Sequence, residues 1–314
     1  MNKSAKKVIA IDCGKMNLKA KCDEREIFYK NAISNYNGDS GMLGNNTFNV
    51  EWEGKEYLVG ERATTMMYGE GKDNDSHILS TLVAVTHFLD EDSVNEDVYL
   101  TYGESFAKYV NIEHKNNIKA KLEKRHRIKV GDKQYDFNIR TVHILPEGIG
   151  HILQEFELYQ GMQYVVDIGG TTVNFLTVND GLPVRELSTS FELGIHSIRG
   201  RVVKEMTEAG LPRMDDLIID EYIRKGAKNE KVQKIINEAK LQQLRDLDGE
   251  LSKYKIDIHG ILMVEDVVFI GGTSQLLEKE IKDYYKGATV LPEGMLANVR
   301  GFYTYGLAKF AQLP

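Results

Sequence analysis

Apolar runs, glycine turns and amphipathic stretches follow one another in a similar order in each half of this chain. In the first half, the β-branched run Val8–Ile11 predicts a buried strand, and the alternating stretch Tyr135–Pro146 predicts another. Between them, the apolar residues of His77–Asp90 fall at helical spacing and predict a buried helix. Further strands are expected at 18–21, 26–30 and 98–103, and a hairpin is expected to turn at Gly54.

The second half begins with the stretch VVDIGGTTVNFLTV, Val165–Val178. An apolar run ends on an aspartate, turns on glycines and threonines, and becomes apolar again, which predicts two strands joined by a tight turn. Asp12 and Asp167 occupy matching places about half a chain apart, which predicts two similar halves rather than a tandem of short repeats. Helices are expected at 197–210, 215–227, 228–254 and 297–314, and a strand, glycine turn and helix at 265–285.

Composition narrows the class of protein. The 314 residues are 42% hydrophobic and 28% charged, which is typical of a soluble globular chain. The net charge of -7 argues against a surface devoted to nucleic acid, and no apolar run approaches the length of a membrane helix. Two cysteines, Cys13 and Cys22, do not imply a disulfide framework. We therefore expect a soluble cytoplasmic protein with no membrane partner.

The two aspartate turns suggest anion chemistry. Asp12-Cys13-Gly14-Lys15 and the turn that begins at Asp167 both follow an apolar strand. Glycines let backbone N–H groups approach a phosphate closely, and lysine or threonine adds further donors. A carboxylate beside phosphates makes sense when Mg²⁺ lies between them, because this ion is commonly held through its waters. Such turns are also common without any ligand, since Asp and Gly are turn formers.

A third glycine turn strengthens the nucleotide interpretation. Gly271-Gly272-Thr273 lies between an apolar strand and a helix, where backbone can lie against a nucleoside or phosphate. An ordinary strand-to-helix turn is the alternative. The chain contains neither G-x-x-x-x-G-K-[ST] nor G-x-G-x-x-G, so the P-loop and the dinucleotide fingerprint are excluded. It also lacks H-E-x-x-H and paired C-x-x-C, so no zinc site is indicated.

These three turns, in this order, resemble the two phosphate loops and the adenosine loop of the actin, sugar-kinase and DnaK-type chaperone superfamily. They occupy 12–17, 167–172 and 271–273, and the stretches 146–153 and 296–308 are similar to its two connecting helices. LPEGIGHILQEF before YVVDIGGTTVNF, together with EYLVGERA and NVRGFYTYG, is similar to plasmid-segregating bacterial actins of the ParM type. The resemblance covers the whole chain.

The resemblance implies an α/β actin-like fold, with two related RNase H-like domains around a nucleotide cleft. The first would span 1–155, with a small subdomain at about 35–75, and the second 156–314, with one at about 199–260. The C-terminal helix would cross back to the first domain. The resemblance further implies ATP or ADP (GTP or GDP in some members) with Mg²⁺, assembly into a filament, and hydrolysis that destabilises it. A DNA-binding adaptor would be the further partner, so no direct nucleic-acid binding is expected.

The resemblance also assigns roles by position. Asp12 and Asp167 would hold Mg²⁺ through water, and Glu147 matches the carboxylate that positions the attacking water. The residues that would face the phosphates are Gly14, Lys15, Asn17, Gly169, Gly170, Thr171 and Thr172. The residues expected around the nucleoside are Gly194 at the ribose, Gly271, Gly272 and Thr273 at the adenosine, and Glu221 and Arg224 at the adenine rim.

Several alternatives remain. Glu147 could serve only to stabilise a helix N-terminus, and Glu221 and Arg224 could belong to a solvated helix face. A sugar or metabolite kinase of the same fold, or a non-polymerising nucleotide-binding regulator, would share the phosphate loops. The basic stretch Lys119–Val130 could meet an anionic partner, although such runs are usually solvated.

Overall fold

The computed structural model describes residues 6–36, 44–66, 71–90, 94–154 and 161–313, and these divide into two units. The first unit comprises Met1–Phe156 and Asn298–Pro314, and the second comprises Glu157–Ala297. Parts of the small subdomain expected at 35–75 lie outside the described residues. Among the described helices, none combines the length and the apolar character needed to span a bilayer.

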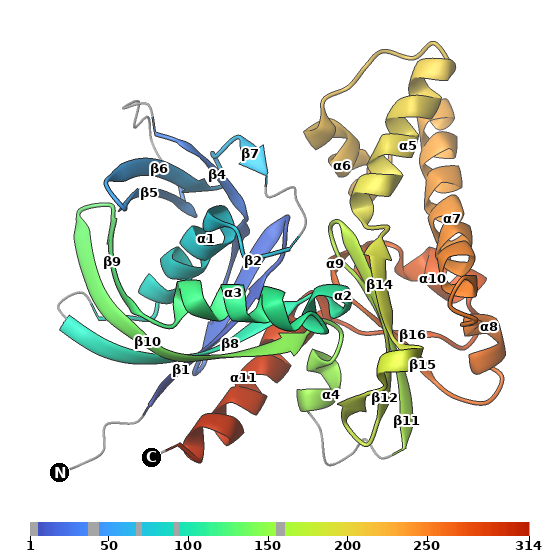
Figure 1. The fold of residues 1–314 in the computed structure, drawn as a ribbon. Helices are drawn as coiled ribbons and strands as arrows, with labels where there is room; N and C mark the ends of the chain where they lie inside the picture. Colours follow the sequence, from blue (N-terminus) through green and yellow to red (C-terminus); the bar gives the residue numbers. More distant parts are fainter. Residues whose placement is uncertain (1–5, 37–43, 67–70, 91–93, 155–160, 314) are drawn as a thin grey trace. The chain divides into compact units, whose positions relative to one another are not determined.

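The first unit is built on a ten-stranded mixed sheet in the order β3-β2-β1-β8-β10-β9-β5-β6-β4-β7 (Figure 1). β1, β2 and β3 form an antiparallel meander, whereas β8 runs parallel to both β1 and β10. The strands are β1 Lys7–Cys13, β2 Asn17–Cys22, β3 Arg25–Lys30, β4 Ala32–Asn35, β5 Thr47–Trp52, β6 Lys55–Gly60, β7 Thr65–Met66, β8 Val94–Glu104, β9 Arg125–Val130 and β10 Lys133–Pro146.

Helices cover both faces of this sheet. α1, Asp75–Thr86, is buried along almost its whole length because it packs on the face of β1 that carries Ile9 and Ile11. α11, Ala297–Ala311, packs on the opposite face, where a side chain at Gly306 would meet Val8 and Thr101. The remaining helices of this unit are α2 Phe106–Tyr109, α3 Ile112–Leu122 and α4 Gly150–Gln154.

Most of the strands and helices of the first unit agree with the pattern of the sequence. The expected hairpin is present as β5 and β6, and its turn places Glu53 and Gly54 at positive φ. The strand expected at 98–103 is longer, since β8 begins at Val94. The basic stretch Lys119–Val130 divides into the end of α3 and the whole of β9, so it is neither one helix face nor one loop.

The second unit contains a six-stranded sheet in the order β13-β12-β11-β15-β16, with β14 also paired to β12. β11 is antiparallel to β12 and parallel to β15, and β15 is parallel to β16. The strands are β11 Met162–Ile168, β12 Thr172–Asn179, β13 Leu182–Pro183, β14 Thr189–Glu192, β15 Val267–Ile270 and β16 Thr289–Val290.

Helices make up the rest of the second unit. α5 and α7 pack together, and α10 lies against α7, where Asp248 accepts hydrogen bonds from Tyr284 and Tyr285 at 2.8 and 2.6 Å. The expected helices are present, and the one expected after Gly271 is broken at Leu277. The helices are α5 Ile195–Glu208, α6 Asp216–Lys225, α7 Glu230–Ser252, α8 Ile258–Ile261, α9 Gly272–Leu276 and α10 Glu278–Tyr284.

The two sheets share one plan. In each unit the first strand is antiparallel to the next strand in the chain and parallel to a later strand on its other side. Asp12 lies next to the end of β1, and Asp167 lies next to the end of β11. The sequence repeat therefore corresponds to a repeated structural element, and both aspartates stand just before the hairpin turn of their own unit.

Candidate functional site

The second unit gathers most of its predicted phosphate-binding residues around one hairpin turn. Ile168 pairs with Val173 across the ladder, and the Gly169 amide donates to the Thr172 carbonyl at 2.9 Å, so residues 169–171 form the turn between β11 and β12. Asp167 is buried at the end of β11, whereas the turn residues are half-exposed. The turn can therefore offer backbone donors to a ligand while the ladder fixes its shape.

Two predicted glycines pack directly on this turn. A Cβ at Gly194 would lie within 3.0 Å of the backbone of Gly170 and Thr171, and one at Gly271 would lie within 3.0 Å of the Asp167 carboxylate. Gly271 also has a φ of +91°, a conformation that residues with side chains rarely adopt. Only glycine fits at either place without moving the turn.

A side-chain contact completes this arrangement, because the Thr273 hydroxyl donates to the Gly169 carbonyl at 2.7 Å. The structure therefore brings together the predicted residues of the second phosphate loop, the ribose glycine and the adenosine loop in one place. We call this set the glycine cradle. Its members are Asp167, Gly169, Gly170, Thr171, Thr172, Gly194, Gly271, Gly272 and Thr273.

The two residues predicted for the adenine rim lie apart from the glycine cradle. Glu221 and Arg224 are exposed on α6, and Glu221 accepts an ion pair from Lys225 at 3.1 Å. In the described part of the chain, the ion pair of Glu221 lies within α6 and does not join the cradle. The buried face of α6 instead carries Asp220, which accepts from Arg199 of α5 at 2.9 Å.

A cavity of about 940 Å³ lies between α5 and α7 in this unit, lined by residues such as Arg201, Lys204, Lys231 and Glu238. None of the residues predicted to contact a nucleotide lines it. Two of its lysines pair with glutamates one turn along largely exposed helix faces, Lys204 with Glu208 and Lys234 with Glu238. This cavity is therefore not the candidate site.

In the first unit, the polar side chains of Asn31 and Ser80 support the predicted first phosphate loop. The loop connects β1 to β2, and the Asn31 amide donates to the Gly14 carbonyl at 2.8 Å. Ser80 of α1 in turn donates to Asn31 at 2.6 Å. Lys15 on the loop and Asn17 at the start of β2 are half-exposed. The buried helix therefore fixes the backbone conformation that the predicted phosphate contacts require.

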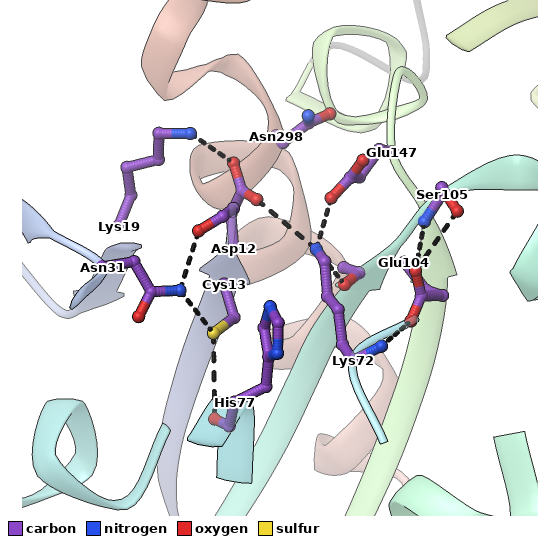
Figure 2. A network of polar contacts seen from close by, with 12 residues as sticks. Asp12, Cys13, Lys19, Asn31, Lys72, His77, Glu104, Ser105, Glu147 and Asn298 are labelled. Carbon is purple, nitrogen blue, oxygen red and sulfur yellow. Dashed lines mark hydrogen bonds and ion pairs between the residues drawn. The ribbon is translucent and has the colours of Figure 1, made fainter. Parts of the chain in front are cut away.

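Asp12 and Glu147 both belong to a buried charge cluster at this end of the sheet (Figure 2). Lys19, the register partner of Asp12 on β2, donates to its carboxylate at 3.0 Å. Glu147 follows the end of β10, and its amide donates to the Glu104 carbonyl at 2.8 Å. Parallel pairing of β8 with β10 places Glu104 opposite Pro146, which brings the ends of these strands together.

Lys72 lies at the centre of the cluster. Its ammonium forms an ion pair with Glu147, lies 4.0 Å from Asp12 and donates to the Gly103 carbonyl at 2.8 Å (Figure 2). The side chain is buried, which would lower its pKa, but the charges of Glu147, Glu104 and Asp12 outweigh burial and raise the pKa of Lys72. Lys72 therefore stays charged and links the predicted metal carboxylate to the predicted catalytic carboxylate.

Sequence reasoning missed Lys72. It stands in the polar stretch GEGKDND before α1, and no local pattern separates it from the exposed lysines of the chain. Its partner Glu104 was also missed, although a carboxylate at the end of an apolar strand repeats the signal that identified Asp12 and Asp167.

Two further groups border the cluster. Cys13 is fully buried, and burial raises the pKa of its thiol, so it is a packing residue rather than a nucleophile. His77 is buried beside Lys72, and burial together with the charge of Lys72 lowers its pKa to about 4, which keeps the imidazole neutral.

In the parts of the chain that the structure describes, no cluster of three or more His, Cys, Asp or Glu residues could hold a metal ion.

Two family descriptions match the chain. Residues 10–150 match the N-terminal domain of actin-like proteins, and residues 165–283 match the C-terminal domain of an archaeal MreB-like actin homologue. No curated protein sequence matches the chain.

Solved structures of the same kind are similar over almost the whole length. An archaeal actin homologue, Ta0583, has a TM-score of 0.81 at 16% identity, covering 96% of this chain and 99% of that one. Its complex with ADP has a TM-score of 0.74 at 15% identity, with 95% and 98% covered. A 15-stranded ParM filament from Clostridium botulinum has a TM-score of 0.77 at 18% identity, with 96% and 99% covered. With its two mixed sheets, its repeated aspartate hairpins and matches in both halves, this chain belongs to the actin-like proteins.

Proposed function

We propose that this protein is a polymerising nucleoside triphosphatase that binds ATP, or GTP, with Mg²⁺ and assembles into filaments. Nucleotide hydrolysis would then destabilise the filament. The observation that carries the proposal is the glycine cradle, in which Gly194 and Gly271 leave no room for a side chain against the turn after Asp167. Such close backbone packing beside a half-exposed turn suits a bulky anion.

The residues present fit a magnesium ion that arrives with the nucleotide rather than a resident one. Each unit supplies one buried aspartate, Asp12 or Asp167, and Mg²⁺ usually combines one or two carboxylates with waters and substrate phosphates. Bound in this way, the ion would neutralise charge on the phosphates. The backbone and hydroxyl groups of the glycine cradle would meet the phosphate oxygens.

Glu147 would act as the residue that orients the attacking water. Phosphoryl transfer requires positioning and charge neutralisation more than covalent chemistry, so one oriented carboxylate is sufficient. The ion pair with Lys72 supports this role, because it fixes the Glu147 carboxylate within the cluster.

Assembly is inferred from similarity alone. One of the structures similar to this chain, which covers 96% of its length, is itself a 15-stranded filament. By the same resemblance, we propose segregation of plasmid DNA as the biological role, with an adaptor protein that contacts the DNA. By the same resemblance, we propose that the protein is located in the cytoplasm.

Light scattering combined with phosphate release tests this proposal. Purified protein should scatter above a critical concentration with ATP-Mg²⁺ or GTP-Mg²⁺, and not with EDTA, and electron micrographs should show filaments. Phosphate transferred to a small hydroxyl compound without any rise in scattering would instead identify a metabolite kinase. Nucleotide binding with neither activity would identify a regulator.

A glutamate pair separates catalysis from assembly. Glu147→Gln should still assemble but release phosphate at least a hundredfold more slowly, as expected when a positioned catalytic group is lost. Glu113→Gln is the matched control because Glu113 is exposed on α3 and should behave as wild type. Unchanged phosphate release by Glu147→Gln would exclude Glu147 as the residue that orients the water.

A further inference from the structure

Hydrogen bonds hold the backbone of the segment that carries Lys72. On its C-terminal side, Asn74 caps α1 by accepting from the His77 amide at 3.1 Å and donates to the Gly71 carbonyl at 3.1 Å. The Lys72 amide donates to the buried Glu104 carboxylate at 3.3 Å. The position of the Lys72 ammonium therefore depends on how firmly this short backbone segment is held.

His114, in the first turn of α3, contacts this segment on one side of its ring and Glu104 on the other. Its Nε2 lies 2.8 Å from Glu104, and its Nδ1 lies 3.4 Å from Asp73. A Cβ at Gly71 would lie within 3.0 Å of the imidazole, so the ring packs directly against the backbone there. One imidazole thus joins the end of β8, through Glu104, to the two residues that flank Lys72.

The charges around His114 favour its doubly protonated form. Both ring nitrogens face carboxylates, and only an imidazolium can donate to both. The hydrogen bond to Glu104 raises the pKa of His114, with a further contribution from Asp73, while partial burial and the charge of Lys108 oppose the rise. Burial opposes ionisation of Glu104, but His114 and Lys72 outweigh it and lower its pKa. Asn117 of α3 is a neutral neighbour that donates to Asp73 at 3.4 Å.

We propose that His114, held between Glu104 and Asp73, is a positioning residue that fixes the segment Gly71–Asp73 and thereby holds the Lys72 ammonium on Glu147. This inference rests on the proposed function, because the reaction that it tunes is nucleotide hydrolysis. His114 would touch neither the nucleotide nor the water, and would act only through Lys72.

The proposal predicts that the rate of hydrolysis falls as the pH rises, which gives its pH profile a basic limb. A histidine whose pKa is raised by folding holds its segment fully at pH values below its ordinary pKa near 6.5. That hold is lost as the pH rises through the higher pKa of the folded protein. Once the ring is neutral, one of its two carboxylates has no donor from it. The segment then loosens, Lys72 leaves Glu147 more often, and phosphate release slows.

Single-turnover phosphate release between pH 6 and 9 provides the test. Wild type should slow at least fivefold across the limb, and His114→Gln should be slow throughout and lack the limb. The milder Asp73→Asn removes one carboxylate, so its limb should move to lower pH. His143→Gln is the matched control: His143 is a half-buried histidine of the same unit whose Nε2 lies 2.9 Å from the Tyr305 hydroxyl, and this variant should keep the wild-type profile.

Two further measurements separate positioning from a general loss of structure. In the Lys72→Met background, adding His114→Gln should slow release by less than twofold, because His114 acts through the missing ammonium. Hydrogen exchange of the peptide that contains the Lys72 amide should become at least tenfold faster in His114→Gln and remain unchanged in His143→Gln.

The outcomes distinguish this inference from the proposed function. If wild type hydrolyses nucleotide but His114→Gln and Asp73→Asn both keep its pH limb, the positioning role is wrong and the proposed function stands. Additive losses in the double variant would also overturn the role. A wild-type protein that binds but never hydrolyses nucleotide would overturn both.

Discussion

Replacement of Lys72 by methionine removes the charge at the centre of the cluster while keeping an unbranched side chain of similar length. In the native protein the ammonium pairs with Glu147, lies 4.0 Å from Asp12 and donates to the Gly103 carbonyl. Methionine would leave the buried carboxylates of Glu147 and Asp12 without the cation that lies beside both of them. We therefore expect Lys72→Met to destabilise the first unit strongly.

The magnitude follows from burial and distance. Two unit charges 4.0 Å apart interact by about 4 kcal/mol at an effective dielectric constant near 20, and removing one partner of a buried pair typically costs about 3–5 kcal/mol. Lys121 supplies a matched control, because its ammonium lies 2.6 Å from Asp75 with both side chains largely exposed. Lys121→Met should cost less than about 1 kcal/mol. Burial, rather than distance, should set the difference.

Urea unfolding followed by tryptophan fluorescence measures this difference. Trp52, the single tryptophan of the chain, lies buried in β5 and so reports on the first unit. In the Lys72→Met background, Glu147→Gln should recover about 1–2 kcal/mol, since it removes one carboxylate left without its cation. The electrostatic reasoning would be refuted if Lys72→Met cost no more than Lys121→Met, or if Glu147→Gln made the double variant less stable.

Two further predictions concern sterics and pH. Gly271→Ala should destabilise the second unit by about 2 kcal/mol and weaken binding of a fluorescent ATP analogue, because its Cβ would clash with Asp167 at positive φ. Gly200→Ala, in α5 with open space around it, should instead stabilise by about 0.5–1 kcal/mol in thermal unfolding. Burial lowers the pKa of His143 to about 4, so the unfolded chain binds more protons between pH 6.5 and 4 and stability falls on acidification; His143→Phe should flatten that fall in urea titrations.

The sequence was sufficient for features that local chemistry specifies. Apolar periodicity located α1 and β11, and glycines next to a strand-ending aspartate located the turn after Asp167, where backbone conformation itself demands glycine. Strand ends were harder. β8 extends back to Val94 through the polar residues Asn95, Glu96 and Asp97, because pairing with β10 rather than hydrophobic pattern holds this part of the strand.

The charge cluster could not be predicted because its members are joined only by the folded sheet. Lys72 and Glu147 are 75 residues apart, and Glu104 is 32 residues from Lys72. Nothing in GEGKDND indicates burial, and a lysine is buried only when such partners compensate the loss of water. His114 was likewise missed, because it stands in a polar and basic stretch of the sequence, although its ring meets two carboxylates.

The two halves repeat one topology but differ in how each aspartate turn is supported. In the second unit, Gly194 and Gly271 press backbone against the turn, so substitutions there should act through steric clash. In the first unit, Lys19 and Lys72 flank Asp12, so substitutions there should act through charge. The destabilisation caused by a steric clash is insensitive to salt. The destabilisation caused by a lost charge depends on which carboxylates remain unpaired. Under the proposed function, anion binding would therefore fall mainly to the rigid backbone of one half, and control of the carboxylate proposed to orient water would fall to the other.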